Sequence, residues 1–184
     1  MFVTSNEVLE EIRDKHSPIN AVKGCIETLD QGFLFLSTLP DEDYNAVAQP
    51  HFTSSIGQHF RHLLDIFHSL YKSRQIIDYN QRRRGHDVEK NKQIAMAELQ
   101  SVIQWLQEMN EEELLEPVTI LTEVSVSQTE SSAMSSTVIR EITFAALHAT
   151  HHYAIAKVIA STLGNITSAE FGVAPATATF IREQ

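Results

Sequence analysis

The sequence contains few residues of several types, and each shortage excludes a class of protein. Only one of the 184 residues is a cysteine, Cys25, so the chain cannot form an internal disulfide. Its 14 lysines and arginines against 24 aspartates and glutamates give a net charge of −10, which argues against a nucleic-acid-binding protein, because such proteins need a basic surface. Hydrophobic residues make up 42% of the chain, enough for an ordinary core and too few for a membrane protein. The length predicts a single domain over residues 1–184.

Long apolar segments and targeting signals are also missing. The N-terminal MFVTSNEVLE has neither the basic region nor the apolar region of a signal peptide. The most apolar stretch, residues 142–164, comes close to a membrane span, which needs about 20 residues. It contains three histidines and a lysine, however, and these residues are costly in lipid. We therefore expect a protein outside the membrane, located in the cytoplasm.

Helical periodicity dominates the chain and predicts four long amphipathic helices. Apolar residues recur at steps of three and four over residues 18–39, about 56–80, about 88–110 and about 136–163. Ser17 followed by Pro18 is typical of a helix start, and Ser54 or Ser55 can begin the second helix in the same way. We further expect a helical turn or two over residues 6–15, a loop over 41–53 and a break between helices over 81–87.

Residues 118–126 have a different pattern, with alternating apolar and polar residues and many β-branched side chains. This pattern favours a strand, and the polar residues 127–137 are expected to return as a weak partner strand or a loop. A C-terminal tail containing Phe171, Gly172 and Pro175 is expected to pack over one end of the helices. The sequence therefore predicts an all-α four-helix bundle with a possible small β-hairpin between the third and fourth helices.

The chain is rich in histidine, with nine residues against five prolines and six glycines. His148 and His152, in HATHH, are four residues apart and therefore lie on one face of the fourth helix, together with the apolar Phe144 and Ile155. Two imidazoles at this spacing can bind one metal ion. The alternative is that the histidines only hydrogen-bond to buried neighbours. Burying both imidazoles without partners would cost about 1–3 kcal/mol each, so the pair favours a metal.

The second helix offers a third imidazole in the segment GQHFRHLLDIFH. Its apolar stripe places His62 near the core and His59 one turn earlier, so helical spacing does not decide which of them points inward. His68 is expected to be exposed. A site with three histidines would keep an open position, as catalytic metal sites do, and the ion would lower the pKa of a water molecule bound there.

SIGQHFRHLLD, followed near the C-terminus by HATHHYAIA, resembles the DinB-like (DinB/YfiT) metalloprotein superfamily. The FGVAPAT tail is similar to one branch of that superfamily, and the resemblance spans nearly the whole chain. It implies an up-down-down-up four-helix bundle, often a homodimer, with a divalent ion held by three histidines. Matched position by position, the implied ligands are His62, His148 and His152. His59 falls outside this set, with a role in the pocket or behind a ligand left open.

Other residues have two interpretations each. Asp65, three residues after His62, is a candidate to orient a ligand imidazole, although a solvated or capping role is the more common one. Tyr153 could hydrogen-bond to a substrate or simply pack against the core. Arg82, Arg83 and Arg84 could bind an anion, but three basic residues between helices usually form a solvated loop. Cys25 lies on an apolar stripe and is expected to be a small core residue.

The sequence leaves three functions open. The first is a metal-dependent enzyme in which the ion activates water or a low-molecular-weight thiol, as in a hydrolase or a thiol transferase acting on a small molecule. Three imidazoles suit zinc, nickel, iron or copper, and no second catalytic residue is recognisable. The second is a non-catalytic metal-binding or small-ligand-binding helical dimer. The third is a helical protein whose histidines are structural.

Overall fold

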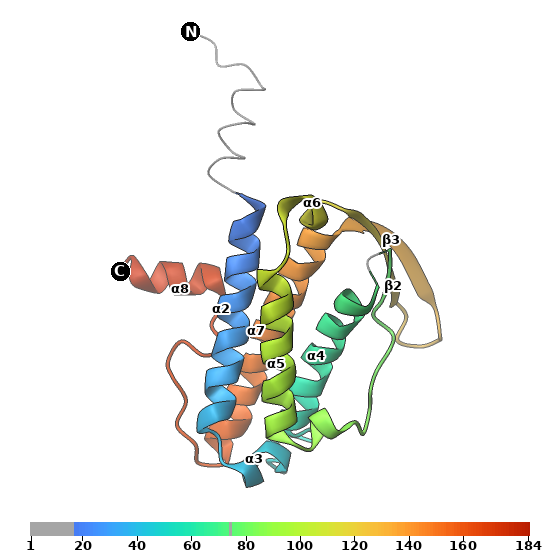
Figure 1. Cartoon of the computed structure of the whole chain (residues 1–184). Helices are drawn as coiled ribbons and strands as arrows, with labels where there is room; N and C mark the ends of the chain where they lie inside the picture. Colours follow the sequence, from blue (N-terminus) through green and yellow to red (C-terminus); the bar gives the residue numbers. More distant parts are fainter. Residues whose placement is uncertain (1–16, 74) are drawn as a thin grey trace.

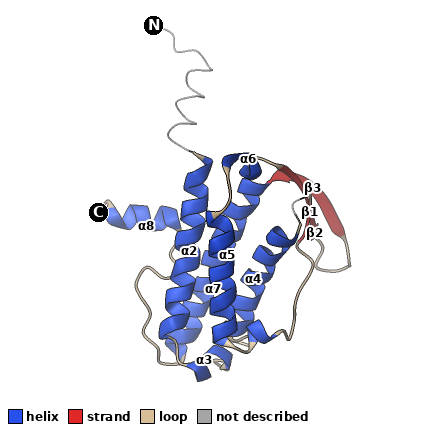
Figure 2. Ribbon diagram, viewed as in Figure 1, coloured by secondary structure: helices blue, strands red, loops and turns tan. Residues whose placement is uncertain are grey.

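Helices make up most of residues 17–73 and 75–184, which are the residues described by this computed structural model (Figure 1). Figure 2 shows the helices gathered on one side and a small sheet at one edge. In chain order the elements are α2 (Pro18–Thr38), α3 (Asp41–Asn45), α4 (Ile56–Lys72), β1 (Ile76–Asp78), η1 (Asp87–Glu89), α5 (Lys92–Gln107), α6 (Glu111–Leu114), β2 (Pro117–Glu123), β3 (Ser131–Thr137), α7 (Val138–Thr162) and α8 (Pro175–Arg182). The helical turn expected over residues 6–15 lies outside the described residues.

Four long helices, α2, α4, α5 and α7, lie side by side around one apolar core (Figure 1). Helices α2 and α4 each contact both α5 and α7. The predicted apolar stripes form this core: Leu29 and Leu36 of α2, Leu63 and Phe67 of α4 and many further side chains are buried. The contact between α4 and α7 matters most for function, because it brings together the two helices that carry the histidine motifs. None of the helices in the described part of the chain is both long and apolar enough to span a bilayer.

The predicted helix starts are confirmed at atomic level. The Ser17 hydroxyl accepts a hydrogen bond from the backbone N–H of Ile19, with Pro18 in the first turn. At the start of α4 the capping residue is Ser55, whose hydroxyl accepts from the N–H of Gln58 while the Gln58 side chain accepts from the N–H of Ser55. This reciprocal pair leaves Ser54, the other predicted cap, free for a different contact.

The second helix is shorter than predicted. It ends at Lys72 rather than near residue 80, because Ile76–Asp78 form strand β1, which pairs in parallel with β2. Here the burial alternates, with Ile77 and Tyr79 buried and Asp78 only partly so. Apolar periodicity did not reveal this change, since the hydrogen-bond partner of β1 lies about forty residues further along the chain.

The predicted hairpin before the last helix is confirmed, with β2 and β3 antiparallel and Thr119 opposite Ser135. With β1 it makes a three-stranded sheet in the order β1-β2-β3, so the chain is mostly helical rather than all-α. Two helical segments also differ from expectation. The expected loop over residues 41–53 contains α3, and the expected helix over 88–110 is divided, because Asn91 caps a new helix after η1.

The C-terminal tail packs against the sides of α2 and α7 rather than over one end of the helices. Phe171 is buried, and its ring stacks on Phe35 of α2 at 4.3 Å and on Tyr153 of α7 at 5.0 Å between centroids. The Lys157 ammonium donates to three backbone carbonyls of the tail, including that of Phe171. The tail is therefore part of the core packing, whereas α8 buries no residue.

Tyr153 and Gly32 form a close contact between α2 and α7. A Cβ atom at position 32 would lie 2.1 Å from the Tyr153 hydroxyl, so only glycine fits there. The hydroxyl is fully buried and has no hydrogen-bond partner among the described residues. Tyr153 stacks on Phe60 of α4 as well as on Phe171. Of its two interpretations, packing against the core is therefore the one the structure supports.

Two glycines of α2 provide a matched test of this packing. Gly32→Ala should lower the free energy of unfolding by about 1–3 kcal/mol, because the methyl group overpacks the contact with Tyr153. Gly24→Ala has open space around its Cβ and should raise the free energy of unfolding by about 0.5–1 kcal/mol through helix propensity. Urea unfolding of the two variants measures both. Equal effects would contradict the close approach of α2 and α7.

Candidate metal centre

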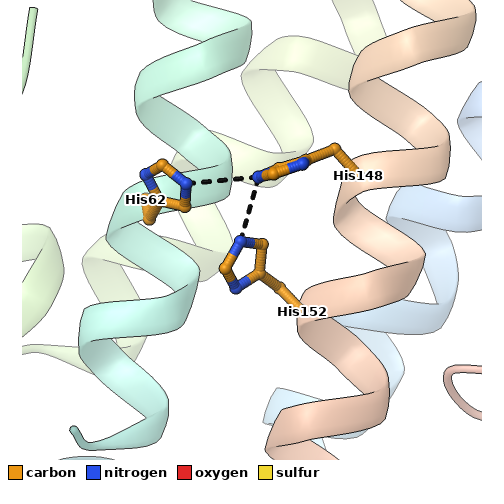
Figure 3. Close-up of side chains that lie close together, drawn as sticks. All are labelled: His62, His148 and His152. Carbon is orange, nitrogen blue, oxygen red and sulfur yellow. Dashed lines mark hydrogen bonds between the residues drawn. The ribbon is translucent and has the colours of Figure 1, made fainter. Parts of the chain in front are cut away.

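The structure brings the three predicted histidines together (Figure 3). His62 comes from α4, and His148 and His152 come from successive turns of α7. The Nε2 atom of His148 lies 3.2 Å from Nε2 of His62 and 3.0 Å from Nε2 of His152. One nitrogen from each of the three side chains lies within 4.8 Å of the others, and all three residues are partly buried.

The rings meet at steep angles rather than stacking. The planes of His62 and His152 are 77° apart, those of His62 and His148 are 72° apart, and those of His148 and His152 are 61° apart. Within this arrangement the Nε2 atoms of His62 and His152 both face Nε2 of His148. The three side chains therefore converge on a common point between α4 and α7.

The imidazoles of the cluster are neutral at physiological pH. Burial, followed by the positive charge of Arg82, lowers the pKa of His62 to about 4. Burial and the neighbouring histidines lower the pKa of His152 to about 3, and burial also lowers the pKa of His148. A neutral imidazole has one free lone pair, which is the form that binds a metal ion.

Hydrogen bonds alone do not satisfy this cluster. A nitrogen of a neutral imidazole carries either one hydrogen or one lone pair. Nε2 of His148 faces two other Nε2 atoms, so it can make a normal hydrogen bond to only one of them. One cation can accept all three lone pairs, and nitrogens bound to it tetrahedrally at about 2.0–2.1 Å lie about 3.3 Å apart, slightly more than the two distances here. The donor set therefore fits a divalent metal ion such as zinc.

His59, the other inward candidate on α4, does not join the cluster. Its Nδ1 lies 2.9 Å from Nδ1 of His152, the ring nitrogen opposite to the one that faces His148. Its Nε2 lies 2.9 Å from the hydroxyl of Ser54. The structure thus separates two residues that helical spacing left equivalent: His62 enters the cluster and His59 lies behind His152. The link to Ser54 was not predicted, because Ser54 was considered only as a helix cap.

Asp65 is engaged by arginines rather than by a histidine. Its buried carboxylate accepts hydrogen bonds from Nη1 of Arg61 at 3.1 Å and from Nε of Arg83 at 2.7 Å. The backbone N–H of Arg83 donates to the same carboxylate at 3.1 Å. Of the expected solvated or capping role, the solvated one is therefore wrong, because the carboxylate is buried, whereas it does accept from a backbone N–H. Asp65 instead fastens the segment 81–87 to α4.

The three consecutive arginines have different environments. Arg83 donates to both carboxylate oxygens of Glu98 on α5, and Arg84 is exposed. Arg82 is partly buried and donates to the carbonyls of Tyr79 and Gln81. Its charge acts on His62 and His148, so Arg82 is the arginine of the three that influences the cluster.

The remaining candidates are not ligands of the cluster, although the ring of His151 borders it, with centroids 5.5 Å from His152 and 6.3 Å from His148. His68 is exposed, as expected, His51, His86 and His151 are exposed as well, and His16 lies outside the described residues. Cys25 is buried, and burial raises the pKa of its thiol to about 12, which excludes a reactive thiolate. A buried carboxylate that sequence reasoning missed, Glu141, accepts from the hydroxyls of Tyr79 and Ser136 two turns before His148. An acidic residue in so apolar a helix could have indicated a buried carboxylate.

Comparison with known proteins gives one family and one relative. A sequence model of the DinB superfamily matches residues 31–156, a range that includes all three histidines of the cluster. A protein of Rhizopus delemar named FK506-binding protein 5 is 27% identical over 109 residues, which cover 59% of this chain and 28% of that protein. The chain thus matches little more than a quarter of that relative's length. No solved structure gives a significant match.

The lowered pKa values predict that metal binding to this cluster depends weakly on pH. Three histidines with ordinary pKa values near 6.5 would lose about a thousandfold in affinity at pH 5.5, because each would be about 90% protonated. His62 and His152, with pKa values of about 4 and 3, stay neutral there. We expect the zinc affinity to fall by less than about tenfold between pH 7.5 and 5.5. Competition with a chelator of known pH dependence measures this, and a thousandfold loss would contradict it.

Proposed function

The chain belongs to the DinB superfamily, and on this premise we propose that His62, His148 and His152 bind one divalent metal ion. The observation that carries the proposal is the convergence of three neutral imidazoles: Nε2 of His148 lies 3.2 Å from that of His62 and 3.0 Å from that of His152, and one nitrogen of each ring lies within 4.8 Å of the others. These contacts cannot all be hydrogen bonds, whereas a single cation would satisfy them together. Zinc, nickel, iron and copper suit this donor set.

We propose further that the protein is a metal-dependent enzyme, of the hydrolase or thiol transferase type, acting on a small molecule. Among the described residues, no fourth His, Cys, Asp or Glu joins the group of three. Three protein ligands with an open position are typical of catalytic sites, whereas structural zinc sites are closed by four. When bound, the ion supplies Lewis-acid activation that lowers the pKa of water or a thiol.

The charges around the cluster favour an anionic nucleophile or substrate group. All three ligands are uncharged imidazoles, so the protein does not neutralise the ion through them. Arg82 adds a positive charge that is felt at His62 and His148, and its hydrogen bonds go to backbone carbonyls rather than to a carboxylate. A thiolate, a hydroxide or a carboxylate at the open position would balance this charge.

The family also supports finer structural proposals. We propose a single domain over residues 1–184 with up-down-down-up helices, since α2 and α7 run one way in Figure 1 and α4 and α5 the other.

We propose a homodimer in the cytoplasm. Exposed apolar side chains on α7, Leu147 and Val158, support the dimer, because they lie three turns apart on one face of the helix.

Metal binding is tested by substitution of one ligand. Protein purified without an affinity tag should contain, or take up, about one equivalent of divalent metal, as elemental analysis and zinc titration would show. His148→Ala should abolish this binding, because it removes the nitrogen that faces both other imidazoles. The control is His151→Ala, which changes an exposed histidine of the same helix. Less than about 0.1 equivalent in the wild-type protein would refute the proposal.

The choice between water and a thiol is tested with cobalt. Cobalt(II) in the site should show an absorption spectrum that changes when a thiol becomes a ligand. For a thiol transferase, one of bacillithiol, mycothiol, glutathione or coenzyme A should produce a strong sulfur-to-cobalt band. No change with any of them would exclude the transferase type and leave water activation or a non-catalytic metal site.

A further inference from the structure

A line of three hydrogen-bonding side chains runs away from the histidine cluster. His152 contacts His148 through Nε2 at 3.0 Å and His59 through Nδ1 at 2.9 Å. His59 in turn contacts the Ser54 hydroxyl through Nε2 at 2.9 Å. All three residues are partly buried. Each of the two imidazoles therefore has a partner for both of its nitrogens.

One pattern of protons satisfies the whole line if Nε2 of His152 is a metal ligand. This nitrogen must then be free of hydrogen, so the single hydrogen of the neutral His152 ring lies on Nδ1. That N–H donates to Nδ1 of His59, which places the hydrogen of His59 on Nε2. The Nε2–H of His59 then donates to the Ser54 hydroxyl oxygen. No nitrogen in the line is left without a partner.

The opposite pattern is incompatible with metal binding. If Nδ1 of His59 donated to His152, the hydrogen of neutral His152 would lie on Nε2 and point into the cluster. The direction of the hydrogen bond between His59 and His152 thus decides whether the Nε2 lone pair of His152 is available. Ser54 contributes because its hydroxyl can accept the Nε2–H of His59 in the pattern that binds metal, which holds the His59 ring with Nδ1 toward His152.

The helix α4 supplies both neighbours of His152. His59 and His62 are one turn apart on α4, so their rings flank His152, with ring centroids 5.2 Å and 4.7 Å from that of His152. Helix α4 therefore contacts the ring of His152 on two sides: His62 on the side of the cluster and His59 on the side away from it.

We propose that Ser54 and His59 are positioning residues of the metal site: His59 accepts the Nδ1–H of His152 and so stabilises the tautomer that binds metal, and Ser54 orients His59. This inference rests on the proposed function, because it concerns affinity for the ion that His62, His148 and His152 hold. Hydrogen-bonding partners behind a ligand histidine commonly contribute a factor of about 10–100 in metal affinity.

The experiment compares a variant that keeps the acceptor with one that removes it. Asparagine carries a side-chain oxygen at about the position of the histidine Nδ1, so His59→Asn can still accept from His152. His59→Leu cannot. Zinc affinity by chelator competition should fall about 10–100-fold in His59→Leu and stay within about threefold of wild type in His59→Asn. Ser54→Ala should lie between them. His68→Leu, an exposed position on the same helix, is the control and should not change the affinity.

A direct readout of the tautomer accompanies the affinities. In the zinc-bound protein, nitrogen NMR should show His152 with a hydrogen on Nδ1 and His59 with a hydrogen on Nε2. Unchanged affinity in His59→Leu, or equal losses in His59→Leu and His59→Asn, would overturn the proposal, since the acceptor would then not matter. Failure of the wild-type protein to bind zinc would instead refute the proposed function. Thermal unfolding of the metal-free variants separates a loss of binding from a loss of folding.

Discussion

The contact between α4 and α7 governs both the core and the histidine cluster. Phe60 of α4 stacks on Tyr153 of α7 at 5.5 Å, and the preceding residues of the two helices, His59 and His152, contact each other at 2.9 Å. Burial of the aromatic pair stabilises one alignment of the helices, and aromatic pairs add about 0.5–1.5 kcal/mol beyond the area they bury. His59 and His152 follow this alignment, since each is covalently next to one of these two buried aromatic rings, and His62 and His148 lie about one turn away along the same two helices. The geometry of a polar site is thus set by apolar packing.

A second constraint acts on the outer side of α4. The buried carboxylate of Asp65 holds Arg61 and Arg83, and Arg83 reaches Glu98 of α5. These ion pairs fasten the segment between β1 and η1 to both helices, and the same segment carries Arg82. Arg82, which was expected in a solvated loop, is therefore kept near the cluster by the ion pairs of the adjacent Arg83. The three-stranded sheet extends this attachment, because β1 joins the end of α4 to the hairpin before α7.

Local signals in the sequence predicted the parts of the fold whose partners are close in the chain. Two helix starts depend on capping contacts within three residues of the chain, and both are confirmed: Ser17 with Pro18 for α2, and Ser55 with Gln58 for α4. The hairpin of β2 and β3 was readable from alternation for the same reason. The end of α4 was not, because Ile76–Asp78 leave the helical pattern to pair with residues 119–121. Asp65 was misjudged because its partner Arg83 is eighteen residues away.

The sequence by itself determined that His148 and His152 share one face of a helix, since four residues make about one turn of any α-helix. It also supplied two histidines on α4, one turn apart and within about 60° of each other around the helix axis. Only the tertiary structure decided that His62 meets the pair on α7 while His59 lies behind His152. The physical reason is that both residues point to the same side of α4. The one that enters the cluster is selected by the rotation and height of α4 against α7, and those are set by side chains distributed over the whole core.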